Sequence, residues 1–281
     1  NLTLNISPGN DRLIGNPYPS AMDADEFIKD NIKETINKKV GRNTDNIFNG
    51  ALYYWDHFGE INTHILREYV GGYATYTLMG GAKAISNDYR INSNLATGTK
   101  IPKQFIPVHQ GFFVIASLDD ELKNITTTVQ GGKIVFKNSQ RIFAAEADGT
   151  SVFMKSENPK NGVAKYAAKK DERQKIWLMY DSPKGYHRQL LIGADENTTN
   201  NFDIGYDAPI ADIGKEDMFW MFDSAKFVIQ GVPNFDKDQE FPLGLKVAKA
   251  GLVRIKIDAL ENVENNVQMY IKDNATLRYY K

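Results

Sequence analysis

Leu13–Ala21 reads LIGNPYPSA and places a glycine, an asparagine and two prolines directly after an apolar pair. Each proline fixes its own φ at about −65° and pushes the residue before it, Asn16 or Tyr18, towards extended backbone. A strand that reaches Leu13 and Ile14 must therefore end and turn sharply here. We expect this corner to fix how the first strand enters a sheet.

Short apolar segments of strand type follow this corner along the chain. They are rich in Val, Ile, Phe, Tyr and Thr, and clusters of Gly, Asn, Asp and Pro separate them. Leu252–Asp258, which reads LVRIKID, alternates after its first step and predicts a strand with one solvated face. The expected strands lie at Leu52–Trp55, Tyr73–Met79, Gly111–Ala116, Lys133–Phe136, Ile176–Tyr180, Gln189–Ile192, Phe219–Phe222, Lys226–Gln230, Leu243–Val247, Leu252–Ile257 and Val267–Ile271.

One helix stands out among these strands. Ile28, Ile32 and Ile36 recur at a spacing of four, which suits one face of an α-helix. Asp23 or Ser20 is placed to cap its first turn. The sequence therefore predicts a helix with isoleucines along one face.

The pattern as a whole predicts an all-β protein of two antiparallel β-sandwich modules, jelly-roll-like in type, with one short embedded helix within residues 23–39. Loop compositions between residues 145 and 165 mark the boundary, since they read AEADGTS and SENPKNG. The first module is expected over residues 1–150 and the second over residues 151–281. The chain begins without a methionine, as a mature fragment or an excised piece would.

Composition excludes several classes of function. The chain has 281 residues with 34 basic and 35 acidic side chains, so its net charge of −1 offers no excess of positive charge to nucleic acid or anionic lipid. It contains no cysteine, which excludes thiolate zinc sites, disulfides and cysteine nucleophiles. No apolar run approaches the roughly 20 residues of a membrane span. We therefore expect neither nucleic-acid binding nor membrane insertion.

A series of short motifs carries a family resemblance. In order they read LIGNPYPSA-x-DADEF, ALYYWDH, ATYTLMGGA, IPVHQGFFV, FKNSQR, IWL, LLIG, DIGYDA, VIQG and FPLGLKV. From about Leu13 to Lys281 the chain resembles a β-rich region of large secreted proteins of flavobacteria and other Bacteroidota. These look like cell-surface proteins and adhesins exported by the type IX secretion system.

The resemblance implies a place in a longer protein. In such proteins this region looks like the stretch ahead of the C-terminal sorting domain, which the export machinery recognises. Another hairpin usually follows, so the second module is expected to lack its final hairpin and Lys281 to fall short of the natural end. The resemblance implies an extracellular or outer-surface location and brings no catalytic residues with it.

The aromatic run Tyr53–Trp55 is the first candidate for ligand binding. On a strand, Tyr53 and Trp55 share one face and Tyr54 takes the other. One face is expected in the core, and the other could stack a sugar ring while Asp56 or His57 hydrogen-bonds to hydroxyls. The candidate glycan site is therefore Tyr54, Trp55, Asp56 and His57, with sheet packing as the competing interpretation.

Alternating oxygen side chains suggest a structural calcium loop. Asn234, Asp236, Asp238 and Glu240 have the spacing of the opening ligands of such a loop, but Gln239 occupies the position where glycine is needed. An acidic turn is the competing interpretation. No other cofactor is expected. Ser224, in Asp-Ser-Ala, fits a short acceptor pattern for bacterial O-glycosylation, a pattern that also arises by chance.

Three functions remain in order of preference. The first is a non-catalytic region of a secreted or cell-surface protein that presents or adheres, with an extracellular glycan or a surface protein as its partner. The second is a carbohydrate-binding module, which an exposed aromatic platform beside acids or amides would favour. The third is a glycoside hydrolase-like enzyme, which needs two carboxylates facing each other across a cleft. No serine elbow, phosphate loop or dinucleotide fingerprint occurs, so no enzyme is expected.

Overall fold

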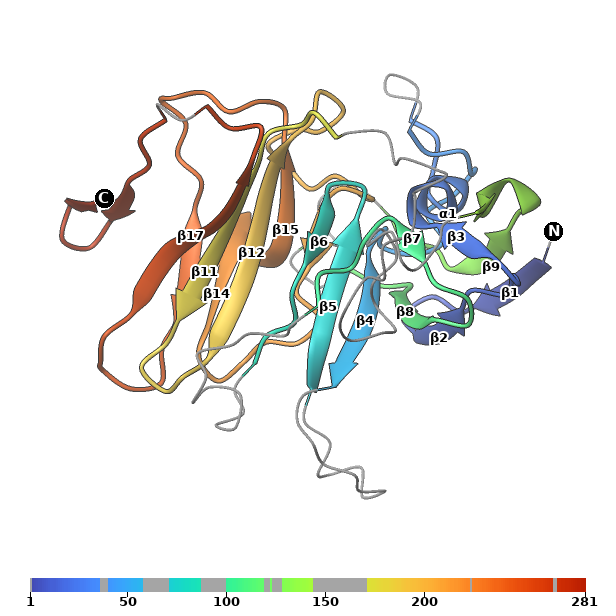
Figure 1. The fold of residues 1–281 in the computed structure, drawn as a ribbon, viewed down its shortest axis with the longest axis horizontal. Helices are drawn as coiled ribbons and strands as arrows, with labels where there is room; N and C mark the ends of the chain where they lie inside the picture. The colour runs from blue at the N-terminus through green and yellow to red at the C-terminus, as the bar shows by residue number, and fades with distance from the viewer. Residues whose placement is uncertain are drawn as a thin grey trace, which may run out of the picture.

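The computed structural model describes residues 2–35, 40–57, 71–86, 100–118, 122, 128–143, 171–222, 224–264 and 267–281. Strands dominate these residues, together with one α-helix and a single 3₁₀ turn at Asn138–Gln140 (Figure 1). The all-β prediction is confirmed. No helix within the described residues is long and apolar enough to cross a bilayer.

Residues of the first half form three sheets. The largest has five strands in the order β2 (Asp11–Gly15), β8 (Gly111–Ile115), β4 (Leu52–His57), β5 (Gly71–Thr77) and β6 (Gly80–Ala82). A second has three strands in the order β10 (Arg141–Ile142), β3 (Ala21–Asp23) and β7 (Phe105–Ile106). The third pairs β1 (Leu2–Ile6) with β9 (Gly132–Phe136).

Residues of the second half form one large sheet and a hairpin. The large sheet runs in the order β16 (Leu243–Lys246), β14 (Asp217–Phe222), β15 (Ala225–Val232), β12 (His187–Ala194), β11 (Lys175–Asp181) and β17 (Arg254–Glu261), with β13 (Ala208–Pro209) added on β15. The hairpin pairs β18 (Ile271–Asp273) with β19 (Arg278–Tyr280).

Two strand predictions need correction. All pairs were expected to be antiparallel, but β12 and β15 run parallel, with Leu191 opposite Ile229. A parallel pair needs a crossover, which residues 195–224 supply while forming β13 and β14 on the way. The strand expected at Val267–Ile271 starts only at its last residue, because Val267 donates its N–H to Glu264 in a turn.

The predicted helix is present but shorter than expected. α1 spans Ala24–Asn31, and the Asp23 carboxylate caps it by accepting the N–H groups of Asp25 and Glu26. Acids in this first turn favour the positive end of the helix dipole. The helix stops because Ile32 adopts an extended conformation; of the predicted span, residues 36–39 lie outside the described part.

The five-stranded sheet lies between α1 and the seven-stranded sheet (Figure 1). On the α1 side, the buried Phe27 ring packs edge-on to Phe112, with 5.6 Å between the ring centroids. It also packs against Phe136, with 5.1 Å between centroids. On the other side, the Trp177 indole donates to Gly81 O at 3.0 Å, which binds β11 to β6. A single connected set of buried apolar residues runs through all three layers. Burial of this kind contributes roughly 25 cal/mol per Å² of apolar surface.

The two halves meet at a contact that only glycine permits. Gly50 and Gly205, both at positive φ, approach so closely that a Cβ on Gly50 would overlap the Gly205 nitrogen. Next to this contact, Leu78 N donates to Gly205 O at 2.8 Å and Thr77 Oγ1 to Tyr206 O at 2.8 Å. DIGYDA is therefore the loop of the second half that docks onto β5.

The described strands form separate sheets in the two halves of the chain, but the two halves share one core. Every described strand of the three smaller first-half sheets lies before residue 143, and the seven-stranded sheet begins at Lys175. The two halves nevertheless share one hydrophobic core and exchange backbone hydrogen bonds, such as the bridge between Ser86 and His187. The expected boundary near residue 150 lies outside the described residues.

The proline corner is organised by one buried amide. Asn16 is 3% exposed, and its side-chain nitrogen lies within donor distance of the carbonyls of Ser20, Ile106 and Pro107. Its side-chain oxygen accepts the N–H of Tyr18 at 2.9 Å. These bonds tie the end of β2 to the loop before β8 and give the turn its direction.

Candidate functional site

The aromatic run on β4 divides between the two faces of the sheet. Tyr54 is 1% exposed and packs on Phe112 in the core, so it offers no ring to a ligand. Its predicted role in glycan stacking is thereby contradicted. Trp55 points the other way and is 41% exposed.

Trp55 belongs to a row of rings from three strands. Its indole meets Tyr73 of β5 at 5.2 Å between centroids, and Tyr73 meets Phe113 of β8 at 5.7 Å, both edge to face. Leu13 of β2, 61% exposed, pairs with Phe113 and continues the row. We call Leu13, Phe113, Tyr73 and Trp55 the aromatic strip.

Local backbone makes room for the outermost ring. Gly71 ends the ladder opposite His57, and a Cβ on Gly71 would lie 2.6 Å from Cζ2 of the Trp55 indole. Contact at that distance is too close for a real side chain, so Trp55 can lie over β5 only because Gly71 has none. The glycine therefore sets the orientation of the exposed indole.

Part of this sheet face is covered by the second half of the chain. Tyr53 is buried, and its hydroxyl donates to Pro209 O of β13 at 3.2 Å. Directly after β13, the carboxylate of Asp212 accepts the Tyr73 N–H at 3.2 Å. The aromatic strip begins where this covering segment ends.

Two carboxylates act on the central ring of the strip. Burial raises the pKa of Tyr73, and the negative charges of Asp212 and Asp11 raise it further. Burial likewise raises the pKa of Asp212, while the Arg188 guanidinium lowers it. The strip therefore offers a neutral phenol and nearby carboxylate acceptors, a combination suited to the C–H faces and hydroxyls of a neutral sugar.

Arg188 fixes the segment that carries Asp212. Its guanidinium donates to Asp212 O at 2.7 Å and forms a two-point pair with Asp217. Asp217 also accepts the N–H of Gly214 at 2.8 Å. A buried charged group thus holds the loop between β13 and β14 against the edge of β5.

The remaining predicted glycan residues take separate positions. Asp56 is 1% exposed, and its carboxylate lies 3.9 Å from the Lys100 ammonium, so it is directed into the protein. His57 is exposed at the end of β4. Of the four predicted residues, Trp55 and His57 face solvent, whereas Tyr54 and Asp56 are buried.

The predicted calcium residues are not gathered around one point. Asp236 accepts the N–H of Asp238, and Glu240 pairs with the Lys272 ammonium at 2.9 Å. No group of three or more His, Cys, Asp or Glu side chains able to hold a metal ion occurs among the described residues. The competing interpretation, an acidic turn, describes this loop better.

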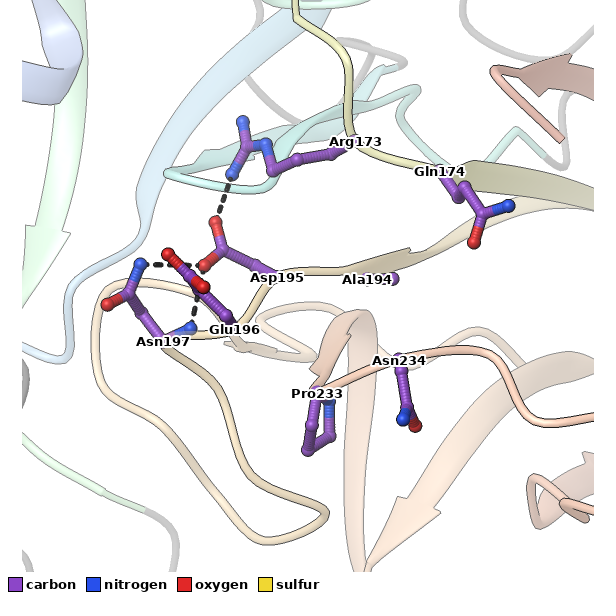
Figure 2. Close-up of a pocket in the computed structure, with 8 residues that line it drawn as sticks. All are labelled: Arg173, Gln174, Ala194, Asp195, Glu196, Asn197, Pro233 and Asn234. Atoms are coloured by element: carbon purple, nitrogen blue, oxygen red, sulfur yellow. Dashed lines mark hydrogen bonds and ion pairs between the residues drawn. The ribbon is translucent and has the colours of Figure 1, made fainter.

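Asn234 lies instead at the rim of an open hollow of about 440 Å³. Figure 2 shows Arg173 and Asn197 both reaching Asp195, with Asn234 and Pro233 across from them. The hollow has no aromatic side chain in its wall; the lining residues are Arg173, Gln174, Ala194, Asp195, Glu196, Asn197, Pro233 and Asn234. It is open and shallow, so it offers little enclosed surface to hold a ligand.

Ser86, His187 and Asp181 lie together at the start of β12. His187 Nδ1 is 2.6 Å from Asp181 Oδ1, and Ser86 is the backbone bridge partner of His187. Ser86 and His187 are only 1% and 2% exposed, and Ser86 Oγ makes no hydrogen bond with His187 Nε2. Acyl transfer needs a nucleophile that a substrate can reach, so this grouping reads as a structural one.

Ser224 occupies the tight turn between β14 and β15. It is exposed and has a φ of 72°. Asp223, the first residue of the predicted acceptor pattern, lies outside the described residues.

Comparison with known proteins identifies a family but indicates no activity. The family model described as a domain of unknown function (DUF8693) matches residues 3–280. The chain belongs to this family. No curated protein and no solved structure matched it. The DUF8693 match includes residues of every described β-sheet.

Proposed function

We propose that the chain is a non-catalytic binding module that holds neutral glycans against the aromatic strip. The observation that carries this is the exposed Trp55 indole, held over Gly71 and packed edge-on to Tyr73. An exposed ring on a rigid sheet presents a flat apolar surface at little entropic cost, because it is already ordered. Asp212 and Asp11 beside Tyr73 supply acceptors for sugar hydroxyls.

The charges near the strip favour neutral over acidic sugars. Both charged groups that act on Tyr73 are carboxylates, and Arg188, the nearest cation of this network, is fully buried and already paired. A uronic or sialic acid would meet like charge at this place. Neutral hexose chains are therefore the expected ligands.

The function in the cell is proposed as presentation or adhesion on a bacterial surface. The resemblance of the series of motifs to type IX-secreted proteins of Bacteroidota supports this location. Immunolabelling of intact source cells, with and without a working type IX system, tests the location. Labelling that stays equal in both would remove the proposed route.

The glycan proposal is tested with an array of neutral and acidic glycans. The native chain should bind neutral members, and Trp55→Ala should weaken that binding roughly tenfold or more, since the stacking ring is lost. Phe143→Ala is the matched control, because Phe143 is a 67% exposed ring outside the strip. Equal weakening in both variants, or no binding by the native chain, would count against the proposal.

A surface protein as partner is the second candidate. The strip is an apolar row in which Leu13 and Trp55 are exposed and Tyr73 and Phe113 are partly buried, and protein interfaces also use such rows. The array separates the two, because a purely protein-binding strip would leave every glycan unbound.

A further inference from the structure

The outer edge of β17 is unpaired in the part of the chain that the structure describes. β17 pairs with β11 alone, and it is the last strand of the seven-stranded sheet. Ile257 and Leu260 on it are 47% and 45% exposed. A free edge of eight residues presents a row of unused N–H and C=O groups, which proteins normally cover or pair.

A bulge sets which side chains share a face of this edge. Trp177 pairs with Ala259 and Leu178 with Ile257, which leaves Asp258 as the extra residue. Because of it, Arg254, Lys256, Ala259 and Glu261 share one face, and Ile255, Ile257 and Leu260 share the other. An unbroken strand would place residues 254 and 261 on opposite faces.

The shifted alternation of side chains makes β17 complementary to a second copy of itself. If a second copy pairs antiparallel about a two-fold axis between Ile257 and Asp258, Arg254 lies opposite Glu261 and Ile255 opposite Leu260. The two-fold repeats both pairs. Directly opposite residues must share a face, and the bulge is what brings these pairs onto common faces.

The charges favour a second copy over an unrelated strand. Arg254 has no ion-pair partner among the described residues, and Glu261 is half exposed, with only the Lys175 ammonium 3.6 Å away. A basic start and an acidic end on the same strand attract an antiparallel copy of that strand at both ends. Edge charges normally oppose pairing, but opposite signs at the two ends favour pairing with an antiparallel copy.

We infer that this chain forms a two-fold homodimer by antiparallel pairing of β17 with β17 of a second copy. The interface is isologous, and it joins the two seven-stranded sheets into one continuous sheet. The dimer carries two aromatic strips, one on each copy. A multivalent ligand would then be held with an avidity that neither strip has alone.

Charge reversal on the full chain tests the inference. Sedimentation equilibrium should show a dimer for the native chain. Arg254→Glu and Glu261→Arg should each weaken it about tenfold or more, because each variant places like charges opposite one another twice. The double variant Arg254→Glu with Glu261→Arg should restore the dimer. Arg278→Glu, on the exposed β19, is the matched control and should leave it unchanged.

Cross-linking gives a second readout. The native chain has no cysteine, so the double variant Ile255→Cys with Leu260→Cys carries the two thiols that the pairing brings together. Oxidation should yield a covalent dimer. A native chain that stays monomeric, a dimer that ignores both charge reversals, or a charge swap that fails to restore it would each overturn the inference. Glycan binding by a monomer would leave the proposed function standing.

Discussion

Arg188 Nε lies 2.8 Å from Asp217 Oδ1, and Arg188 Nη2 lies 2.9 Å from Asp217 Oδ2, with both side chains completely buried. The pair links β12 to β14 across the intervening β15. Charge-assisted bonds of this two-point kind combine energy with fixed geometry. The same guanidinium holds Asp212 O, so the pair positions the loop beside the aromatic strip.

Breaking this pair should cost a large part of the stability. Asp217→Asn removes the two-point carboxylate partner and leaves the buried guanidinium with only Asp212, at 3.6 Å, as a counter-charge, so we expect a loss of about 3–5 kcal/mol in urea unfolding. The double variant Arg188→Met with Asp217→Leu removes both charges and should recover much of that loss. Asp273→Asn on the exposed hairpin is the control. A loss under about 1 kcal/mol for Asp217→Asn would show that the pair is dispensable.

Stability should depend on the charge of Asp25. Burial, and then the charge of Asp23, raise the pKa of Asp25 to about 6, although Tyr76 donates to its carboxylate at 2.8 Å. A carboxyl whose folded pKa is raised favours folding in its protonated form. Its contribution is therefore present below about pH 4 and is lost as pH rises through about 6.

Asp25→Asn isolates this effect. The difference in unfolding free energy between the variant and the native chain should grow in favour of the variant between pH 4 and 7, by on the order of 2–3 kcal/mol. The amide oxygen can still accept from Tyr76. A difference that stays constant over this range would show that Asp25 titrates normally.

Alanine substitutions at Gly50 and Gly9 separate the cost of backbone strain from the cost of steric overlap. Both have a positive φ, 84° and 81°, but a Cβ on Gly50 would overlap Gly205 whereas a Cβ on Gly9 meets nothing within 4 Å. Gly9→Ala should cost about 1–2 kcal/mol through strain alone. Gly50→Ala should cost clearly more in the same thermal or urea measurement. Equal costs would show that the two loops can move apart.

The stability of the proline corner should depend more on the Asn16 side-chain amide than on the two proline rings. Pro17→Ala and Pro19→Ala should each lower the free energy of unfolding by about 0.4–1 kcal/mol, through a more flexible unfolded chain. Asn16→Ala should cost at least about 2 kcal/mol, because it removes the buried amide that donates to the carbonyls of Ser20, Ile106 and Pro107. An unchanged urea midpoint in all three variants would contradict the assigned role of the corner.

The sequence was enough to locate most strands and the helix start, because these depend on local periodicity and on one capping carboxylate. It could also separate Tyr54 from Trp55 by alternation. It could not say which face was solvated, since that depends on Phe112 packing on Tyr54 and on Phe27 packing on Phe112. Tyr73 and Phe113 were placed on strands, but only strand pairing brings their rings together. No local signal reports such pairing, nor the parallel order of β12 and β15.

The docking of DIGYDA on β5 bears on how the chain folds as it is made. Leu78 and Thr77 bond to Gly205 and Tyr206, which leave the ribosome more than a hundred residues later. Until then, the end of β5 and the adjoining part of the shared core lack the partners that the second half provides. Contacts so distant in sequence are formed slowly, since a long loop must close first. The first half is therefore expected to persist as an incomplete, aggregation-prone nascent chain. A chaperone that binds this intermediate would protect it until the second half is made.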